Sequence, residues 1–530
     1  MSISRTRPRH RDERAAGRAA EFVPVRVSLS DLLGADYIQA VCQARSAVSG
    51  QDVAALLRLA RRKVDLFPRR FQRALAGRLG EVGSRVTAPL AGGAAGATTK
   101  AFRAATHREA APLTGWGYYR VGEDGRLYLT TKSEHYHVPL GHGFGGYRLL
   151  EHARRLGLCS TTHNNTRGHV TRRLEGELLA AANAPHEDGR SADLDCVLNL
   201  ETGSLAVEAG LKMMLARFYR VQGGAGGARP PSAGSAPVFG VLGDADGGPT
   251  ANYHGTTMLT QVLRGMWPEL AAGLAEAGLF RVAPVRPNVM EDLEGLFERH
   301  ARGPQRLAGF LHELVLMNYG GLRLEPAFVR RLYELCEQHG VPTLCDEIQS
   351  CVWAPELFLF REYGVRPSFV AVGKGLPGGE YPASRLLFRS QMDTLPQFGA
   401  LVTNGQEELA SLAYLVTMRW ARANAEATRA VGQYYRERLE DLAAAHPRHI
   451  DAVQGRGHMG TVWFRDVETA EAFAKAVAAG GVDISVQSYK AACPPAALTK
   501  LPLIADRAVV DFVVGRFAAV LEQIGSGGHG

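Results

Sequence analysis

The chain has 530 residues, which is enough for at least two hydrophobic cores. Its 46% hydrophobic and 22% charged content is typical of a soluble globular protein. No stretch approaches about 18 uninterrupted apolar residues, so we expect no transmembrane helix, and the N-terminus lacks the apolar segment of a secretory signal. Seven scattered cysteines without a CxxC pair argue against a disulfide framework and a zinc site. We therefore expect a cytoplasmic protein that holds no metal.

The net charge of +8 is unevenly distributed along the chain. Residues 1–105 contain 19 Lys and Arg against 8 Asp and Glu, a net of +11, so the remaining 425 residues carry about −3. A basic extension can bind nucleic acid or an anionic membrane, but aromatic residues are sparse here and no binding motif is present. We expect a solvated, partly helical arm or a subunit contact, without nucleic-acid binding.

The N-terminal part reads as a disordered segment followed by helices. Residues 1–25 are rich in arginine and are expected to be disordered. Ser30-Asp31 predicts the start of a helix that reaches about Ala47, and DVAALLRLARRKVDLF (52–67) has apolar residues at helical spacing. Pro68 interrupts this pattern before it resumes.

A linker of small residues at 90–100 marks a boundary between this extension and the rest of the chain. The segment GWGYYRVGEDGRLYLT (115–130) then predicts a β-hairpin with its turn at Glu123-Asp124-Gly125.

From about 190 to 400, short apolar runs alternate with amphipathic helical patterns. CVLNL precedes a helix at 204–220, VFGVLG precedes one near 255–264, and FLHELVLM precedes one at 325–339. TLCDE and FVAVGK follow. This alternation predicts a mainly parallel sheet covered by helices on both faces. Residues 425–530 contain a long helix, short strands such as MGTVWF and a closing helix, which predicts a smaller α+β unit.

Two acids follow an apolar run in VPTLCDEIQS (341–350). Such a pair is most often a strand end that has reached solvent, but in a parallel sheet ligands gather at the carboxyl ends of strands. Asp346 ends one apolar run, and Lys374 ends another between Gly373 and Gly375, which leave room beside the backbone. Burial lowers the pKa of a lysine and makes its amine a nucleophile. An ordinary loop lysine is the simpler alternative.

Three further segments carry polar groups at the starts of helices or in loops. In LNLETGSLAVEAGLK (198–212) a strand, the turn Thr202-Gly203-Ser204 and a helix follow one another. The free amides and positive dipole of that helix suit a phosphate, and an ordinary helix cap is the alternative. ANYHGTT (251–257) places an aromatic beside a His-Gly loop, and LVTNGQEELA (401–410) opens another helix.

This order of phosphate site, aromatic, acid and lysine resembles the pyridoxal-phosphate (PLP) enzymes of aspartate-aminotransferase fold, and among them the class III aminotransferases of ornithine, acetylornithine and GABA type. The match is strongest between 300 and 410, where the chain follows the family's "DEvQ", "ygv.PD" and "gKgl.gG.yP". GSLAVEAGLK is similar to "SGsEAvEaAlK", and NYHGTT to "fHGrT". The resemblance covers about 120–520 and leaves residues 1–105 outside.

The resemblance implies roles for matching positions. Lys374 would carry PLP as a Schiff base and then act as the general base. Asp346 would pair with the pyridine nitrogen and keep it protonated, which lets the ring accept electrons from the substrate. Gln349 would reach the phenolic oxygen of the cofactor. Tyr253 would stack on the ring face with His254 beside it.

The remaining implied contacts concern the phosphate and a second subunit. Thr202, Gly203 and Ser204 would form the phosphate site, and Thr403 of the neighbouring subunit would complete it, so the resemblance implies a homodimer. Glu313 matches the acid of the family's "EP" element, although Leu314 replaces the proline.

The match also breaks at several places. CVWAPE (351–356) stands where the family has "GfGRtG", and Leu205 stands where a glutamate is usual. Near the C-terminus, Thr499 and Lys500 occupy the region where an arginine often binds the substrate carboxylate, and Lys500 could replace it as a point charge. Other candidates for that role are Arg323, Arg385 and Arg456.

We predict an α/β protein of PLP-dependent transferase fold type I, with a mainly parallel sheet in the large domain. The expected units are a basic extension at 1–105, a small domain built from 106–190 and 425–530, and a PLP-binding domain at 191–424. The leading function is a ping-pong aminotransferase acting between an amine or amino acid and a carbonyl acceptor. An aminomutase or racemase on the same scaffold, and a non-catalytic binding protein, are the alternatives. No G-x-G-x-x-G follows an early strand, which argues against an NAD enzyme.

Overall fold

The computed structural model describes residues 21–106, 108–159, 166–186, 189, 191–219, 236–243, 252–488 and 493–527. Most of the segment expected to be disordered, residues 1–20, therefore lies outside the described part. Within that part, no helix combines the length and apolar character needed to cross a bilayer.

A seven-stranded sheet in the order β6-β14-β13-β12-β9-β7-β8 forms the centre of the large unit. Its strands run parallel to one another except β14, which is antiparallel to both of its neighbours. The strands are β6 (Cys196–Leu200), β7 (Ala236–Leu242), β8 (Arg281–Val285), β9 (Gln305–His312), β12 (Thr343–Asp346), β13 (Phe369–Val372) and β14 (Ser384–Phe388). The mixed, mostly parallel sheet confirms the predicted fold class.

The two faces of this sheet belong to two different hydrophobic cores. In β13, Phe369 and Ala371 pack into the core that contains α9 (Gly203–Tyr219), whereas Val370 and Val372 pack into the core that contains α12 (Met290–His300) and α13 (Pro326–His339). Alternate side chains of a strand point to opposite faces, and both faces of this one are buried. The strand therefore reads as a continuous apolar run, as the sequence suggested.

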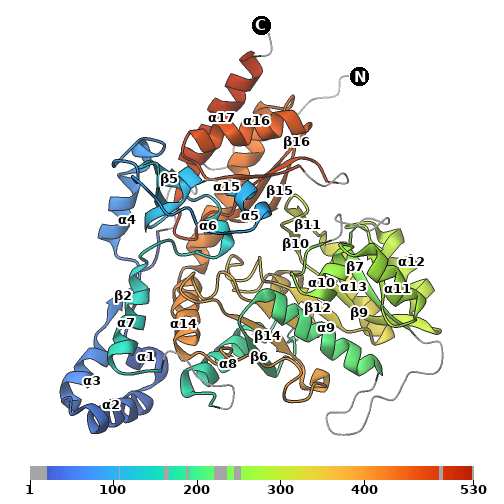
Figure 1. The fold of residues 1–530 in the computed structure, drawn as a ribbon, viewed down its shortest axis with the longest axis horizontal. Coiled ribbons are helices and arrows are strands. Elements are labelled where there is room, and N and C mark those ends of the chain that lie inside the picture. The colour runs from blue at the N-terminus through green and yellow to red at the C-terminus, as the bar shows by residue number, and fades with distance from the viewer. Residues whose placement is uncertain are drawn as a thin grey trace, which may run out of the picture.

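Helices flank the sheet on both sides (Figure 1). Besides α9, α12 and α13, the large unit contains α8 (His169–Ala182), α10 (Met258–Arg264), α11 (Pro268–Glu276), the two-stranded ladder of β10 (Val315–Leu316) and β11 (Leu322–Arg323), and α14 (Glu408–Ala423).

The C-terminal residues form a four-stranded antiparallel sheet in the order β15-β16-β18-β17. Its strands are β15 (Ile450–Arg456), β16 (Met459–Phe464), β17 (Ser485–Gln487) and β18 (Ala496–Leu498), and its helices are α15 (Ala425–Ala445), α16 (Val467–Ala479) and α17 (Arg507–Gly527). The long helix, the MGTVWF strand and the closing helix are confirmed.

The predicted hairpin is also confirmed and lies beside the C-terminal sheet. Strands β4 (Tyr119–Gly122) and β5 (Leu127–Leu129) pair around the expected turn, and β3 (Pro112–Trp116) adds a third strand. A bridge from Leu129 to Val482 links this small sheet to the C-terminal region, so segments far apart in sequence pack together.

The N-terminal extension differs from the predicted solvated arm. Ser28, and not Ser30, caps the first helix through a bond from the Asp31 amide, and Gly34 divides the expected single helix into two. Phe22 is buried with its ring 5.5 Å from that of Trp420, so residues 21–25 are ordered because they bury apolar surface against the main body. The extension's elements are α1 (Leu29–Leu33), α2 (Ala35–Ser49), α3 (Val53–Arg61), β1 (Arg26–Val27) paired with β2 (Val64–Asp65), α4 (Arg69–Ala76) and α5 (Lys100–Ala105).

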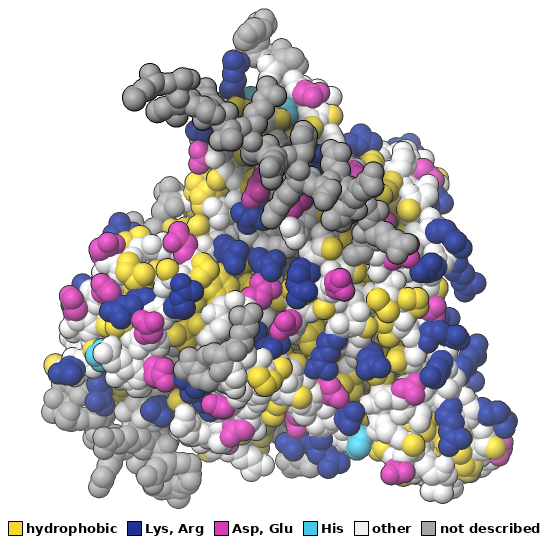
Figure 2. Space-filling view, turned by 180° about the vertical axis from the view of Figure 1, so that it is seen from behind, with side chains coloured by type: hydrophobic (Ala, Val, Ile, Leu, Met, Phe, Trp, Pro, Cys, Tyr) yellow, Lys and Arg dark blue, Asp and Glu magenta, His cyan; other side chains and the backbone are white. Residues whose placement is uncertain are grey.

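The extension adds a lobe to one side of the molecule. Helices α1 and α3 contact α7 (Arg148–Arg155), and α1–α3 lie together with it at the lower left of Figure 1. On the face shown in Figure 2, Lys and Arg side chains are interspersed with Asp and Glu. The excess basicity of the sequence does not gather there into one continuous patch.

Candidate active site

A cavity of about 470 Å³ lies at the carboxyl edge of the central sheet. The loops that follow β6, β7, β9, β12 and β13 all contribute to its wall, which is the place where parallel sheets bind ligands. Eight of the nine predicted site residues line it: Thr202, Gly203, Ser204, Tyr253, His254, Asp346, Gln349 and Lys374. The sheet topology therefore brings together residues that are up to 172 positions apart in the sequence (202 to 374).

Asp346 does not surface into solvent at the end of β12. Its side chain is buried, and its Oδ2 lies 2.9 Å from Nδ1 of His254, whose side chain is fully buried. Its Oδ1 accepts a hydrogen bond of 3.1 Å from the backbone amide of Ile348. A buried carboxylate held by a histidine and an amide is an organised acceptor for one more donor from the cavity.

Lys374 lies two residues beyond β13, the strand that pairs with β12 in a register that sets Asp346 opposite Ala371. Its backbone adopts a φ of 46°, which is unusual for a residue with a side chain and is typical of functional positions. Burial lowers the pKa of its amine, against the opposing effect of Glu313 and Asp346. This places a nucleophilic amine and a carboxylate at adjacent strand ends.

The glycines beside Lys374 do not leave open space, contrary to our expectation. A β-carbon on Gly373 would come within 2.2 Å of Ser384 Oγ, and one on Gly375 within 2.3 Å of the Trp353 ring. The protein's own side chains fill these positions, so the glycines permit close internal packing.

Glu313 is a further acid of the cavity wall, next to the end of β9. Its side chain is buried, and burial together with the nearby Asp346 raises its pKa well above the usual value. Asn252 bonds to this acid and also places its Nδ2 atom 3.3 Å from Nε2 of His254. Sequence reasoning missed Asn252, because nothing in one sequence separates a buried loop asparagine from an exposed one.

The start of α9 forms a cradle that fits an anion. Thr202 Oγ1 caps the helix by accepting a bond of 3.3 Å from the Leu205 amide. The alternative that Thr202 is a helix cap is therefore confirmed, and Thr202 lines the cavity as well. Ser204 Oγ accepts a bond of 3.1 Å from the Thr256 amide, which ties the two loops together. Gly255 has a φ of 137°, and a β-carbon there would lie 2.8 Å from Ser204 Oγ. Only glycine allows this close approach.

A strained turn reaches the site from the N-terminal side. Ser133, Glu134, His135 and Tyr136 all have positive φ, between 48° and 75°, and form one left-handed turn, marked α6 in Figure 1. Left-handed backbone costs about 1–2 kcal/mol per residue. The turn places the Tyr136 ring 5.4 Å from Nζ of Lys374.

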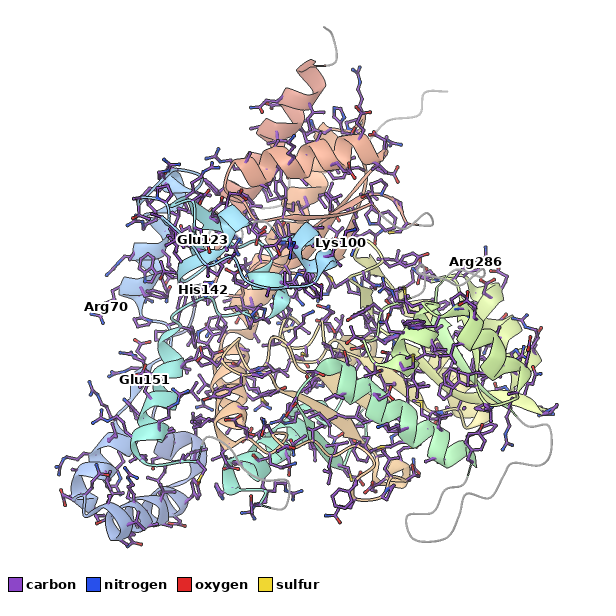
Figure 3. The ribbon with its side chains drawn as sticks, viewed as in Figure 1. Arg70, Lys100, Glu123, His142, Glu151 and Arg286 are labelled. Atoms are coloured by element: carbon purple, nitrogen blue, oxygen red, sulfur yellow. The ribbon has the colours of Figure 1, made fainter. Side chains whose placement is uncertain are left out.

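Charged side chains hold this turn. The Glu134 carboxylate accepts from Arg120 and, at 2.9 Å, pairs with Nε2 of His142, which Figure 3 labels beside the turn. Arg120 also lies 3.4 Å from Asp483 of the C-terminal region. Strain that is held in this way beside a cavity is typical of functional sites, and no sequence pattern indicated it.

None of the proposed arginines lines the cavity. Arg385 is fully buried and bonds to Leu200 O and Ser384 O, Arg323 bonds to the Tyr363 hydroxyl, and Arg456 pairs with Glu362. Lys500 is fully buried behind the wall and does not line the cavity either. None of these four side chains lines the cavity in the single chain, and a role for any of them in binding a substrate carboxylate stays a prediction.

Two predicted residues need separate description. Tyr253 lines the cavity, and the guanidinium of Arg264 lies 5.3 Å from its ring centroid. Thr403 is exposed and lies outside the wall, while the amide of its neighbour Asn404 donates to Glu201 at 3.3 Å. The prediction that Thr403 serves a second subunit stays a prediction.

Comparisons with known proteins agree with this architecture. The family model described as Aminotransferase class-III matches residues 114–493. The 5-aminovalerate aminotransferase of Pseudomonas aeruginosa is 30% identical over 223 residues, which are 40% of this chain and 52% of that protein. The ornithine aminotransferase of Bordetella pertussis is 26% identical over 432 residues, 78% of this chain and 92% of that protein. The chain spans about half the length of the first curated relatives that it matches.

A solved ornithine aminotransferase of Toxoplasma gondii, described with PLP at its active site, shares the fold with a TM-score of 0.61 and 19% identity. The superposition covers 80% of this chain and 96% of that one. This likeness confirms the predicted fold type. Since the family model matches well over half of its residues, the chain belongs to the class III aminotransferase family.

Proposed function

We propose that the protein is a PLP-dependent aminotransferase that moves an amino group from an amine or amino acid to a carbonyl acceptor. Members of this family use PLP. The observation that carries the proposal is the meeting of Lys374, Asp346 and the α9 cradle in one cavity. An aldehyde, a pyridine nitrogen and a phosphate would each find a partner of suitable chemistry there.

The residues fit that cofactor. The amides at the start of α9, with Ser204, would hold the phosphate, in a cradle that any side chain at Gly255 would fill. Lys374 would hold the aldehyde carbon, and Asp346 would accept a hydrogen bond from the pyridine nitrogen. Gln349 and Tyr253 would contact the ring. When bound, PLP withdraws electrons from the substrate carbon next to the transferred nitrogen.

The protein's own groups would then manage the proton. The Lys374 amine has a lowered pKa because it is buried, so a larger fraction of it is neutral and able to take a proton from that carbon. Asp346 stays in place because His254 and the Ile348 amide bind its two oxygens. The donor would leave as a carbonyl compound before the acceptor enters, in a ping-pong order.

We further propose the arrangement of the whole protein. Residues 191–424 would form the cofactor domain, 106–190 with 425–530 the small domain, and 1–105 an extension. Two copies would form a dimer in which Thr403 of one completes the phosphate site of the other.

The test is to add PLP to the purified full-length protein and to Lys374→Ala. Wild type is expected to gain a visible absorbance band that the variant lacks, because the Lys374 amine in the cavity wall is the group that would attach the aldehyde covalently. A screen of amine donors with an α-keto acid should then release a carbonyl product from the donor. Absence of the band in wild type would favour a binding protein. An isomerised amine without a carbonyl product would indicate an aminomutase or racemase.

A further inference from the structure

A second buried lysine lies behind the wall of the cavity. Lys500 follows β18 and is fully buried. Its backbone amide donates to Thr131 O at 2.7 Å, and its carbonyl accepts from Ser133 Oγ at 2.6 Å. These two hydrogen bonds join the Lys500 backbone to the start of the left-handed turn whose Tyr136 ring lies near Lys374.

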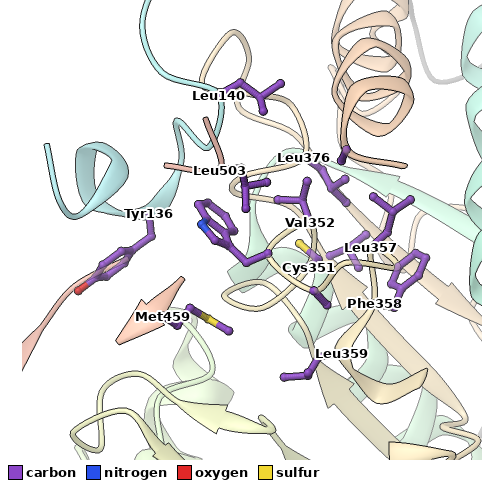
Figure 4. Packing of buried hydrophobic residues seen from close by; sticks show 14 of the residues in the cluster. Tyr136, Leu140, Cys351, Val352, Leu357, Phe358, Leu359, Leu376, Met459 and Leu503 are labelled. Atoms are coloured by element: carbon purple, nitrogen blue, oxygen red, sulfur yellow. The ribbon is translucent and has the colours of Figure 1, made fainter. Parts of the chain in front are cut away.

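The Lys500 amine is surrounded by aromatic rings and an amide. Its Nζ lies 3.9 Å from the centroid of the Trp353 ring and 5.1 Å from that of Tyr136. It donates to the backbone carbonyl of Gln349 and lies 3.5 Å from Oε1 of the same residue. Figure 4 shows that Tyr136 and the apolar loop at Cys351–Val352 come from separate segments, so the amine joins parts of the chain that are distant in sequence.

No carboxylate of the described residues lies within ion-pair distance of this amine. Burial, with Lys374 nearby, lowers its pKa well below the usual value. An amine that is buried without a carboxylate partner opposes folding, and an apolar side chain of similar length would fill the same space without that cost. The arrangement therefore indicates a task for the amine other than stability.

The contact with Gln349 defines that task. The N–H groups of the Lys500 amine face two acceptors of Gln349, its backbone carbonyl and Oε1 of its side-chain amide, so the amine lies on the oxygen side of that amide. With Oε1 turned toward Lys500, the NH₂ group of Gln349 is left for the cavity that this residue lines.

We propose that Lys500 is a positioning residue that fixes Gln349 as a hydrogen-bond donor to an oxygen atom of the bound cofactor. This inference rests on the proposed function, because the phenolic oxygen of PLP is the acceptor that it assigns.

The experiment uses purified full-length wild type, Lys500→Met, Gln349→Ala and the double variant, with Lys475→Met on the exposed face of α16 as the control. Two quantities are measured: the unfolding midpoint of the protein without cofactor, and the Kd for PLP. Lys500→Met is expected to bind PLP about 10-fold more weakly, with an unfolding midpoint equal to or above that of wild type. Gln349→Ala should weaken binding similarly, and the double variant no further.

Gln349→Glu supplies an independent variant if Lys500→Met does not fold. A carboxylate at this half-buried position would pair with the Lys500 amine and remove the donor. The unfolding midpoint without cofactor is expected to rise while PLP affinity falls about 10-fold. A midpoint that stays the same or falls in this variant would overturn the inference.

Three other results would also overturn the inference: unchanged affinity in Lys500→Met, a parallel loss of midpoint and affinity, or additive effects in the double variant. Failure of the proposed function is a separate outcome, since wild type itself would then take up no PLP.

Discussion

Glu347, the second acid of the DEIQ segment, offers a direct test of how burial acts in this fold. Its side chain is fully buried and accepts bonds from Ser350 Oγ at 2.6 Å and from the amides of Leu359 at 2.9 Å and Phe360 at 2.6 Å. These bonds hold the segment from Ser350 to Phe360, whose apolar side chains lie near Leu376 in the buried cluster shown in Figure 4. Burial raises the pKa of this carboxyl to about 7, and the hydrogen bonds only partly offset it.

The sign of the effect follows from proton binding. Between pH 4.5 and about 7 the native state holds a proton on Glu347 that the unfolded chain has lost, so the free energy of unfolding falls as pH rises through this range. The difference of about 2.5 pH units corresponds to about 3 kcal/mol. This stability is present at low pH and is lost above about pH 7.

The assay is urea unfolding of wild type and Glu347→Gln from about pH 5 to about pH 8. Burial lowers the pKa of His312 and of His458 to about 4. These two histidines therefore lower the free energy of unfolding as pH falls, which opposes the effect of Glu347 in wild type. They are common to both proteins and cancel in the difference. That difference should shift by about 2.5 kcal/mol in favour of the variant between about pH 5 and about pH 8, because a small part of the total is already lost at pH 5. Glu298→Gln, on the exposed surface of α12, is the control. A difference that does not vary with pH would refute the reasoning.

Two further predictions concern the cavity. Asp346→Asn keeps the size of the side chain but removes the charge that binds His254 and the proposed pyridinium. We expect kcat/KM to fall at least about 100-fold and PLP affinity about 10-fold. An unchanged kcat/KM would show that Asp346 does not act in the site. Gly255→Ala introduces a β-carbon 2.8 Å from Ser204 Oγ and 2.9 Å from its Cα, and PLP titration should show at least about 10-fold weaker binding. Gly273→Ala on α11, where a β-carbon meets nothing within 4 Å, should leave binding unchanged.

Several features of this protein could be predicted from the sequence because they depend on local patterns. The apolar runs that end in Asp346 and before Lys374 are strands of a mostly parallel sheet, and the Thr202-Gly203-Ser204 turn opens a helix as expected. A parallel sheet places the carboxyl ends of its strands at one edge, so residues recognised one by one had to share a cavity. The roles assigned to them by resemblance stay predictions.

Other features could not be read from the sequence because they depend on pairings across the whole chain. The partnership of His254 with Asp346 spans 92 positions, and the contact of Lys500 with Gln349 spans 151. The left-handed turn at Ser133–Tyr136 contains no glycine that would indicate it in the sequence, and Arg120 and His142, which pair with its Glu134, come from outside the turn. A pattern of residue types determines which face of an element is apolar. Only packing determines which polar groups meet once water has been excluded, and that decides which of the charged residues belong to the site.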